Sequence, residues 1–216
     1  MKRRLVDNGL SITMGVLFLV ALAGQIYTGS ASYNQEQVEH GETPADIVSY
    51  LTTAHFTSAL FENWESEFLQ MGLFVALTVF LRQKGSPESK PEGKSEIDRE
   101  PDPGRRGAPW PVRAGGLIGK VYENSLSLAL FALFGMSFVL HLVTSASHQT
   151  AERLAHGEAP ATVLSTATDP TFWFESFQNW QSEFLSVAVL AVLAIFLRQK
   201  GSPESKPVDA PDSETG

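Results

Sequence analysis

The amino-acid sequence predicts an all-α integral membrane protein, a four-helix bundle built from two tandem, parallel two-helix repeats. The first observation behind this prediction is that apolar and charged residues are segregated along the 216 residues, with long charge-free stretches alternating with short stretches that hold almost all the Lys and Arg. Segregation of this kind is typical of membrane proteins. The second observation is that residues 7–91 align with residues 123–207 without a gap, which indicates an internal repeat.

The two aligned copies share three motifs. Both contain His-Gly-Glu-x-Pro, which begins at His40 and His156, and Trp-x-Ser-Glu-Phe, which begins at Trp64 and Trp180. The run RQKGSPESKP also occurs verbatim in both copies. A polar run of this composition cannot pack a core. Recent duplication therefore explains the exact match between the two runs at least as well as a shared function does.

Each copy opens with a charge-free stretch long enough to cross a bilayer, for which about 20 apolar residues suffice. The first stretch follows Lys2, Arg3 and Arg4 and so resembles a secretory signal. Its counterpart lies in mid-chain, where no signal peptide can be, so we interpret both as permanent transmembrane helices. The predicted helices cover about residues 8–29 and 124–146.

The second helix of each copy is less obvious, because the charge-free runs at residues 68–81 and 184–197 are short. Such a run is about 21 Å long as a helix, less than the roughly 30 Å of a hydrocarbon core. We therefore expect the preceding polar residues to be drawn to membrane depth. Asp169 and Pro170 suit the start of the later helix. The predicted helices cover about residues 60–83 and 170–199.

The distribution of basic residues predicts the orientation, because cytoplasmic flanks carry the excess of Lys and Arg. Of the 16 basic residues, only Arg153 falls in a predicted outer loop. Both chain ends and the linker are therefore predicted to be cytoplasmic, and an even number of crossings per copy makes the two copies parallel. The predicted parts are a first repeat at 1–91, a flexible linker at 92–122, a second repeat at 123–207 and a disordered tail at 208–216.

Composition excludes several classes of function. The chain has no Cys, which removes disulfides, thiol chemistry and cysteine-ligated metals. Its net charge of -8 makes it a poor partner for nucleic acid. The sequence shows no nucleophile with a base, no Gly-rich phosphate loop and no dense metal cluster. We therefore expect no enzymatic activity, no catalytic residue, no bound metal and no cofactor.

The first candidate site is a set of polar residues expected inside the membrane. A carboxylate at that depth costs several kcal/mol unless it is protonated or paired, so it should face the bundle interior. Counting residues from the inner boundary puts Glu67 at the depth of Gln25, and Glu183 at the depth of His141. The set serves either function or helix packing. Its members are Gln25, Asn63, Glu67, His141, Asn179 and Glu183.

The second candidate site lies in the predicted outer loops, where a Glu precedes a His by four residues in both copies. Residues at this spacing share a helix face and can share a metal or sense pH. The alternative is structural, because Gly41 and Gly157 are natural helix C-caps. Two further histidines, His55 and His148, have no counterpart in the other copy and are expected to be solvated. The candidate residues are Glu36, His40, Glu42, Glu152, His156 and Glu158.

The chain resembles a family of small bacterial membrane proteins grouped as a domain of unknown function. The resemblance rests on the Asn-x-Leu-Ser start, the His-Gly-Glu-x-Pro loop and the Asn-Trp-x-Ser-Glu-Phe-Leu segment before an Arg-Gln-Lys-Gly exit, and it covers nearly the whole chain outside the linker and tail. It implies a bacterial cytoplasmic membrane protein and no particular activity.

Two functional hypotheses follow. The first is a non-enzymatic multi-pass membrane protein that packs with itself or with another membrane protein, the duplication having fused an ancestral two-helix homodimer. The alternative is a small transporter or channel in which Glu67 and Glu183 line a proton or cation path. In both, the lipid bilayer is the expected environment, and partners beyond it are a second copy of the chain or another membrane protein.

Overall fold

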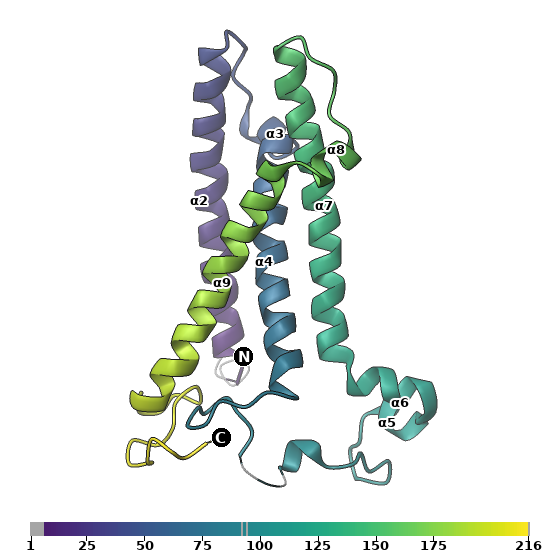
Figure 1. Ribbon diagram of the computed structural model, residues 1–216, viewed down its shortest axis with the longest axis vertical. Helices are drawn as coiled ribbons and strands as arrows, with labels where there is room; N and C mark the ends of the chain where they lie inside the picture. Colours follow the sequence, from purple (N-terminus) through teal and green to yellow (C-terminus); the bar gives the residue numbers. More distant parts are fainter. Residues whose placement is uncertain (1–6, 92, 94, 216) are drawn as a thin grey trace. The chain divides into compact units, whose positions relative to one another are not determined.

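The computed structural model describes residues 7–91, 93 and 95–215 (Figure 1). The chain divides into two compact units, each built from two separate stretches. Unit 1 comprises Met1–Phe61 and Leu140–Thr168, and unit 2 comprises Glu62–Val139 and Asp169–Gly216. The unit boundaries fall inside α4 (Ala54–Thr78) and α7 (Ser125–Ala155), so each of these helices contributes a segment to both units.

Unit 1 contains α2 (Gly9–Glu39), α3 (Ile47–Tyr50), the start of α4, the later half of α7 and α8 (Val163–Ala167). The helix predicted to end near residue 29 continues to Glu39, and α7 likewise continues beyond residue 146 to Ala155. Neither extension contains Gly or Pro, the two residues that most often interrupt a helix, and α2 ends on the helix-forming residues Gln35, Glu36 and Gln37.

Both long helices of unit 1 end at a glycine. Gly41 and Gly157 have φ angles of 75° and 73°, a left-handed conformation that suits Gly at the residue after a helix C-cap. In α2 the backbone N–H of His40 donates to the carbonyl of Glu36 over 3.0 Å, and the equivalent bond in α7 spans 3.3 Å. The predicted helix-ending role of these glycines is confirmed.

The loops after α2 and α7 fold back along the helices that precede them. Asn34 exchanges two hydrogen bonds with the backbone of Ala45, of 2.9 and 2.8 Å. At the equivalent place after α7, the hydroxyl of Thr150 donates to the carbonyl of Ala161 over 3.1 Å. The first returning loop buries Tyr50, which is 2% exposed. A side chain added at Gly29 would come within 2.3 Å of the Tyr50 hydroxyl, so this glycine makes room for the ring.

Unit 2 contains most of α4, the linker, the earlier half of α7 and α9 (Pro170–Phe196). Helix α9 begins at the predicted residue, because the Asp169 side chain accepts a hydrogen bond from the N–H of Thr171 over 2.8 Å. Aromatic rings join α7 to α9, with centroids 5.8 Å apart for Phe138 and Phe172. The linker contains three short helices, η1 (Glu96–Asp98), α5 (Trp110–Ala114) and α6 (Gly116–Glu123). Its flexibility stays a prediction.

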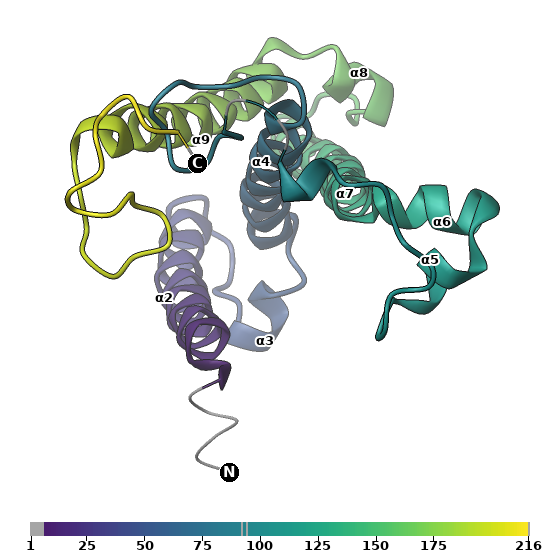
Figure 2. The same ribbon diagram turned by 90° about the horizontal axis from the view of Figure 1, so that it is seen from below.

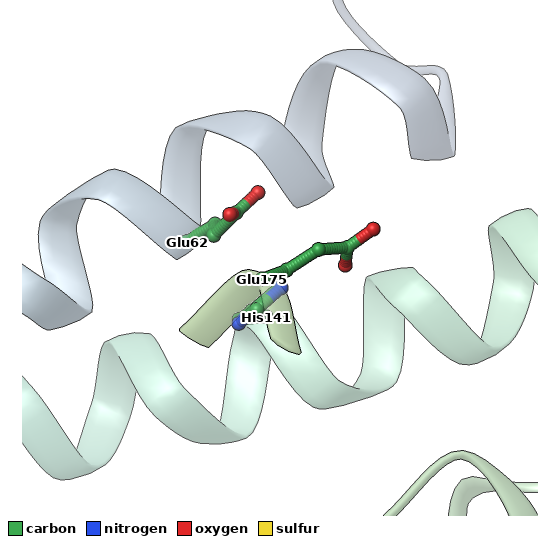
Figure 3. Close-up of side chains that lie close together, drawn as sticks. All are labelled: Glu62, His141 and Glu175. Carbon is green, nitrogen blue, oxygen red and sulfur yellow. The ribbon is translucent and has the colours of Figure 1, made fainter. Parts of the chain in front are cut away.

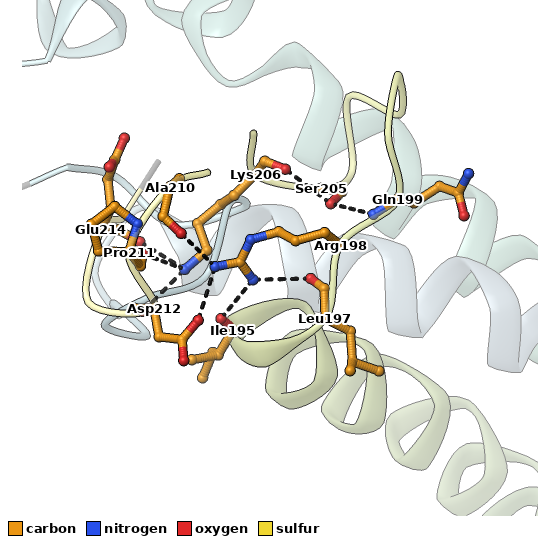
Figure 4. Close-up of polar contacts among 10 residues, drawn as sticks. All are labelled: Ile195, Leu197, Arg198, Gln199, Ser205, Lys206, Ala210, Pro211, Asp212 and Glu214. Atoms are coloured by element: carbon orange, nitrogen blue, oxygen red, sulfur yellow. Dashed lines mark hydrogen bonds and ion pairs between the residues drawn. The ribbon is translucent and has the colours of Figure 1, made fainter. Parts of the chain in front are cut away.

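The run RQKGSPESKP forms the same turn at both of its positions in unit 2. In each, the N–H of the Gln donates to the hydroxyl of the second Ser over 2.9 Å, at Gln83 and at Gln199. The tail predicted to be disordered is held against the second turn (Figure 4). Arg198 bonds Asp212 over 2.9 Å, and the ammonium of Lys206 donates to the carbonyls of Pro211, Asp212 and Glu214. The mobility of the tail stays a prediction.

Three helices of the described residues are long and apolar enough to cross a membrane, namely α2, α7 and α9. On α2 the side chains of the five consecutive residues 16–20 are each at least 48% exposed. Five residues exceed one helical turn, so apolar surface faces outward on every side of α2 there, which suits lipid and not water. Helix α4, predicted as a fourth crossing, is not among the three. It carries Glu62, Glu65 and Glu67 within six residues and ends at Thr78, before the predicted residue 83.

Candidate functional site

The first candidate site is the polar contact between α4 and α9 in unit 2, called here the α4–α9 contact. The two helices run in the same direction and diverge toward Thr78 and Phe196 (Figures 1 and 2). Near their starts, the side-chain amide of Asn179 donates a hydrogen bond to Glu62. One turn further along α4, the indole N–H of Trp180 donates to Glu65 over 3.3 Å. Glu65 is fully buried, so the indole supplies a donor to a carboxylate that lies out of water.

A third acid, Glu175 of α9, lies beside the same contact. Figure 3 shows its side chain near that of Glu62, and a carboxylate oxygen of one lies within 4.8 Å of an oxygen of the other. Both side chains are half-buried. Two carboxylates this close repel when both are ionised, so the amide of Asn179 and any shared proton or cation stabilise the arrangement. His141, also drawn in Figure 3, is a fully buried residue of α7 in unit 1.

The predicted intramembrane residues fall at several places in the two units. Asn179 takes part in the α4–α9 contact. Glu183 of α9 is half-buried and lies within electrostatic reach of Glu67, an exposed residue of α4. Asn63 is exposed on α4, and Gln25 is half-buried on α2. The predicted proximities of Glu67 to Gln25 and of Glu183 to His141 join residues of different units and stay predictions.

Sequence reasoning missed Glu62, Glu65 and Glu175 as site residues. It looked for residues that recur in both copies, whereas the positions equivalent to these acids hold Gln178, Gln181 and Ala59. One signal could have found the first two acids. Their spacing of three residues puts them on one face of a helix that also has to carry apolar residues into the membrane.

The second candidate site is a cavity of about 510 Å³ in unit 1, called here the histidine cavity. Four of the chain's five histidines line it. All six residues predicted for the outer-loop site lie in its wall, so unit 1 brings together the two loops that the sequence could only compare. These six are Glu36, His40, Glu42, Glu152, His156 and Glu158.

The other two histidines of the cavity were predicted to be solvated, and the structure shows both of them partly exposed in the cavity wall. His55, in the first turn of α4, and His148, on α7, are both half-buried, with ring centroids 6.0 Å apart. The Tyr50 hydroxyl lies 3.2 Å from Nδ1 of His55. Burial lowers the pKa of His55, and nearby His148 lowers it further, while Glu36 opposes the shift. His55 is therefore held in its neutral form over a wider pH range than a histidine in water.

Helical content and three candidate membrane spans define the class of the protein, a possible multi-pass membrane protein. The chain belongs to the family described as "Domain of unknown function (DUF6766)", whose model matches residues 1–216. No curated protein and no solved structure matches the chain. The family assignment agrees with the resemblance to a domain of unknown function and brings no activity with it.

Proposed function

We propose that the chain is a non-enzymatic, multi-pass protein of the bacterial cytoplasmic membrane that acts as an interaction module. Its ancestor, on this proposal, was a two-helix protein that formed a homodimer, and duplication joined the two subunits into one chain. The two copies then pack about a pseudo-twofold axis along the membrane normal, with α4 as the fourth crossing and both chain ends in the cytoplasm.

The observation that carries the proposal is that the residues of α4 and α9 in contact occupy nearly equivalent positions of the two copies. Equivalent positions of the two copies are 116 apart, since residue 7 aligns with residue 123. Asn179 and Glu62 are 117 apart, and Trp180 and Glu65 are 115 apart. In a twofold interface, residues close to the axis meet their own counterparts or immediate neighbours. Contacts of this kind are therefore expected of a fused homodimer.

The same relation holds outside the helices. Glu88 and Glu204 occupy equivalent positions in the two RQKGSPESKP turns, and Glu204 contributes to raising the pKa of Glu88, so the two carboxyl groups interact. Glu67 and Glu183, which interact electrostatically, are also equivalent. Pairing of counterparts in the middle of α4 and α9 and again in the turns that follow them supports an origin of the two copies as subunits of a homodimer. Hydrogen bonds between the two helices also reduce the cost of placing acids in a crossing helix.

Disulfide cross-linking tests the proposal, because the chain contains no Cys that could interfere. Glu62→Cys combined with Asn179→Cys should form an intramolecular disulfide in membranes, visible as a mobility shift that a reductant reverses. When residues 1–105 and 106–216 are co-expressed as separate pieces, the same pair should join them covalently. Leu77→Cys with Leu193→Cys is the matched control, because these positions are also equivalent but lie where α4 and α9 diverge.

Two results would contradict the proposal. One is an absence of cross-linking at residues 62 and 179 in a variant that still inserts into membranes. The other is equal cross-linking of the control pair, which would indicate random collision. If the separate pieces insert but fail to associate, the interface does not hold two subunits together, and an origin as a homodimer is excluded.

A second candidate function is a small proton or cation carrier that uses Glu67 and Glu183. The observation in its favour is that these equivalent acids act on one another electrostatically, as residues that bind a cation jointly must. Proteoliposomes that contain the purified chain should then show acid-dependent flux, and Glu67→Gln with Glu183→Gln should abolish it. Liposomes that contain wild-type protein and show no flux would exclude the carrier and leave the interaction module.

A further inference from the structure

We propose that the histidine cavity binds one divalent transition-metal ion of the Zn²⁺ class, with His55, His148 and Glu36 as its protein ligands. Imidazole nitrogens and carboxylate oxygens are common ligands of Zn²⁺, and three protein ligands leave a fourth position for water. The metal site does not depend on whether the chain is an interaction module or a carrier. Two of its three ligands, His55 and His148, have no histidine at the equivalent position of the other copy.

The environment of His55 suits a metal ligand. Its Nδ1 lies 3.2 Å from the hydroxyl of Tyr50, and in the tautomer with the proton on Nδ1 the ring donates to that hydroxyl. This tautomer presents the lone pair of Nε2, the form that a metal requires. Tyr50 is 2% exposed and held by α3, so it fixes the ring orientation, as hydrogen-bond partners of metal-bound histidines commonly do.

His148 stands opposite His55 and has a partner of its own. The two rings are 6.0 Å apart between centroids and inclined by 34°, a separation at which both can contribute a nitrogen to one ion. Nδ1 of His148 lies 3.6 Å from a carboxylate oxygen of Glu152, one turn further along α7. This distance is longer than a hydrogen bond, and a small rotation of the exposed Glu152 side chain closes it; a hydrogen-bonded carboxylate then orients a ligating histidine and raises its basicity. Glu152 is therefore a positioning residue in this site.

Charge also favours a cation at this position. Glu36 lines the cavity and acts electrostatically on His55. The cavity wall holds four carboxylates, those of Glu36, Glu42, Glu152 and Glu158, and one guanidinium, that of Arg153, so acidic groups are in excess. Among the described residues, the proposed ligand atoms do not already lie within 4.8 Å of one another. Because the Glu36 side chain is exposed, it can rotate inward to complete the coordination.

Metal titration of the full chain tests the proposal. The protein is purified in detergent with a tag that contains no histidine, treated with a chelator and titrated with Zn²⁺ in a calorimeter. Wild type should bind one Zn²⁺ per chain. Co²⁺ bound in its place should give the visible absorption of a four-coordinate site with nitrogen and oxygen ligands. His148→Ala and Glu36→Gln should each weaken Zn²⁺ binding at least tenfold, and Glu152→Gln about 10–100-fold.

The matched control is His40→Ala combined with His156→Ala, which removes two histidines from the same cavity without touching the proposed ligands. Both residues are exposed, and this variant should bind Zn²⁺ within about twofold of wild type. His55→Gln keeps a polar partner for Tyr50 and should lose binding while retaining the helical circular dichroism of wild type. Wild type that takes up no Zn²⁺ would overturn the proposal. So would a control variant that loses binding as completely as His148→Ala.

Discussion

The two copies of RQKGSPESKP, at residues 82–91 and 198–207, have one sequence and one backbone turn but different surroundings. Gly85 and Gly201 have φ angles of 85° and 86°. Lys90 forms an ion pair with Asp98 over 2.6 Å, whereas Lys206 is 4% exposed and donates to three backbone carbonyls. Local sequence therefore determines the turn, while the chain that follows determines what covers it.

Other equivalent positions of the two copies also share a backbone conformation but have different neighbours. The loops after α2 and α7 end their helices with equivalent hydrogen bonds, yet only the first brings an aromatic ring, Tyr50, against a histidine. Equivalent positions can thus share a backbone and differ in chemistry. The predictions below compare such positions directly.

The largest effect should come from reporter fusions, which test whether equivalent segments lie on the same side of the membrane. Alkaline phosphatase fused after residue 45 or residue 160 should be active, and after residue 100 or residue 207 inactive. The reason is that 15 of the 16 basic residues then lie in the cytoplasm. Green fluorescent protein at the same four sites should give the opposite pattern. An active phosphatase at residue 100 would reverse the proposed topology.

A large difference in stability should separate Glu65→Ala from Gln181→Ala. These residues are equivalent, but Glu65 is fully buried and accepts a hydrogen bond from Trp180, whereas Gln181 is exposed. Removing the buried acceptor leaves the indole without that partner and should cost about 1–3 kcal/mol. The exposed change should stay within about 0.5 kcal/mol. Thermal unfolding in detergent, followed by circular dichroism, measures both variants. Equal losses would show that burial of the acid is irrelevant.

A smaller difference should separate Gly85→Ala from Gly201→Ala. Both variants incur about 1–2 kcal/mol for a left-handed non-glycine residue. Only at Gly85 would the new side chain also meet a backbone atom, the carbonyl oxygen of Asp212, at 2.4 Å. Gly85→Ala should therefore displace the tail, and hydrogen exchange of residues 208–215 should accelerate. The same segment should exchange at nearly the wild-type rate in Gly201→Ala.

The smallest effect concerns pH. Burial raises the pKa of Glu88 above its usual 4.5, and the hydrogen bond with Glu204 and the charge of Glu204 raise it further. A raised pKa in the folded chain means that the contribution to stability is complete below pH 4.5 and is lost as the pH rises through the raised value. The contact between the two turns should thus weaken slightly above that value. Glu88→Gln should remove this pH dependence from the thermal midpoint, and a midpoint that keeps it would assign the effect to other groups.

Local signals in the sequence predicted much of the secondary structure. Asp169 and Pro170 marked the start of α9, and Gly41 marked the end of α2. These signals depend on backbone hydrogen bonds between near neighbours, which a short segment specifies alone. The predicted crossing ended near residue 29, whereas α2 continues beyond the length needed to span a bilayer and ends at Glu39, just before the C-cap His40 and Gly41.

The candidate sites were less predictable for a different reason. Comparison of the two copies draws attention to positions where both copies hold the same residue. The other copy holds a different residue at the positions equivalent to His55, His148, Glu62 and Glu65. Their importance depends on which loops and helices meet in space, and that depends on packing far along the chain. The six loop residues were found because they recur, and the structure adds that they surround one cavity.

The backbone N–H of Gly85 donates to the hydroxyl of Thr215 over 2.8 Å, across 130 positions of sequence. Translation proceeds from the N-terminus, so the first turn leaves the ribosome long before its partner has been synthesised. Until then this N–H is bound to water or to a temporary neighbour. The hydrogen bond can form only after α7 and α9 have been synthesised. Protection of the Gly85 amide from hydrogen exchange would therefore show when unit 2 is completed during biosynthesis.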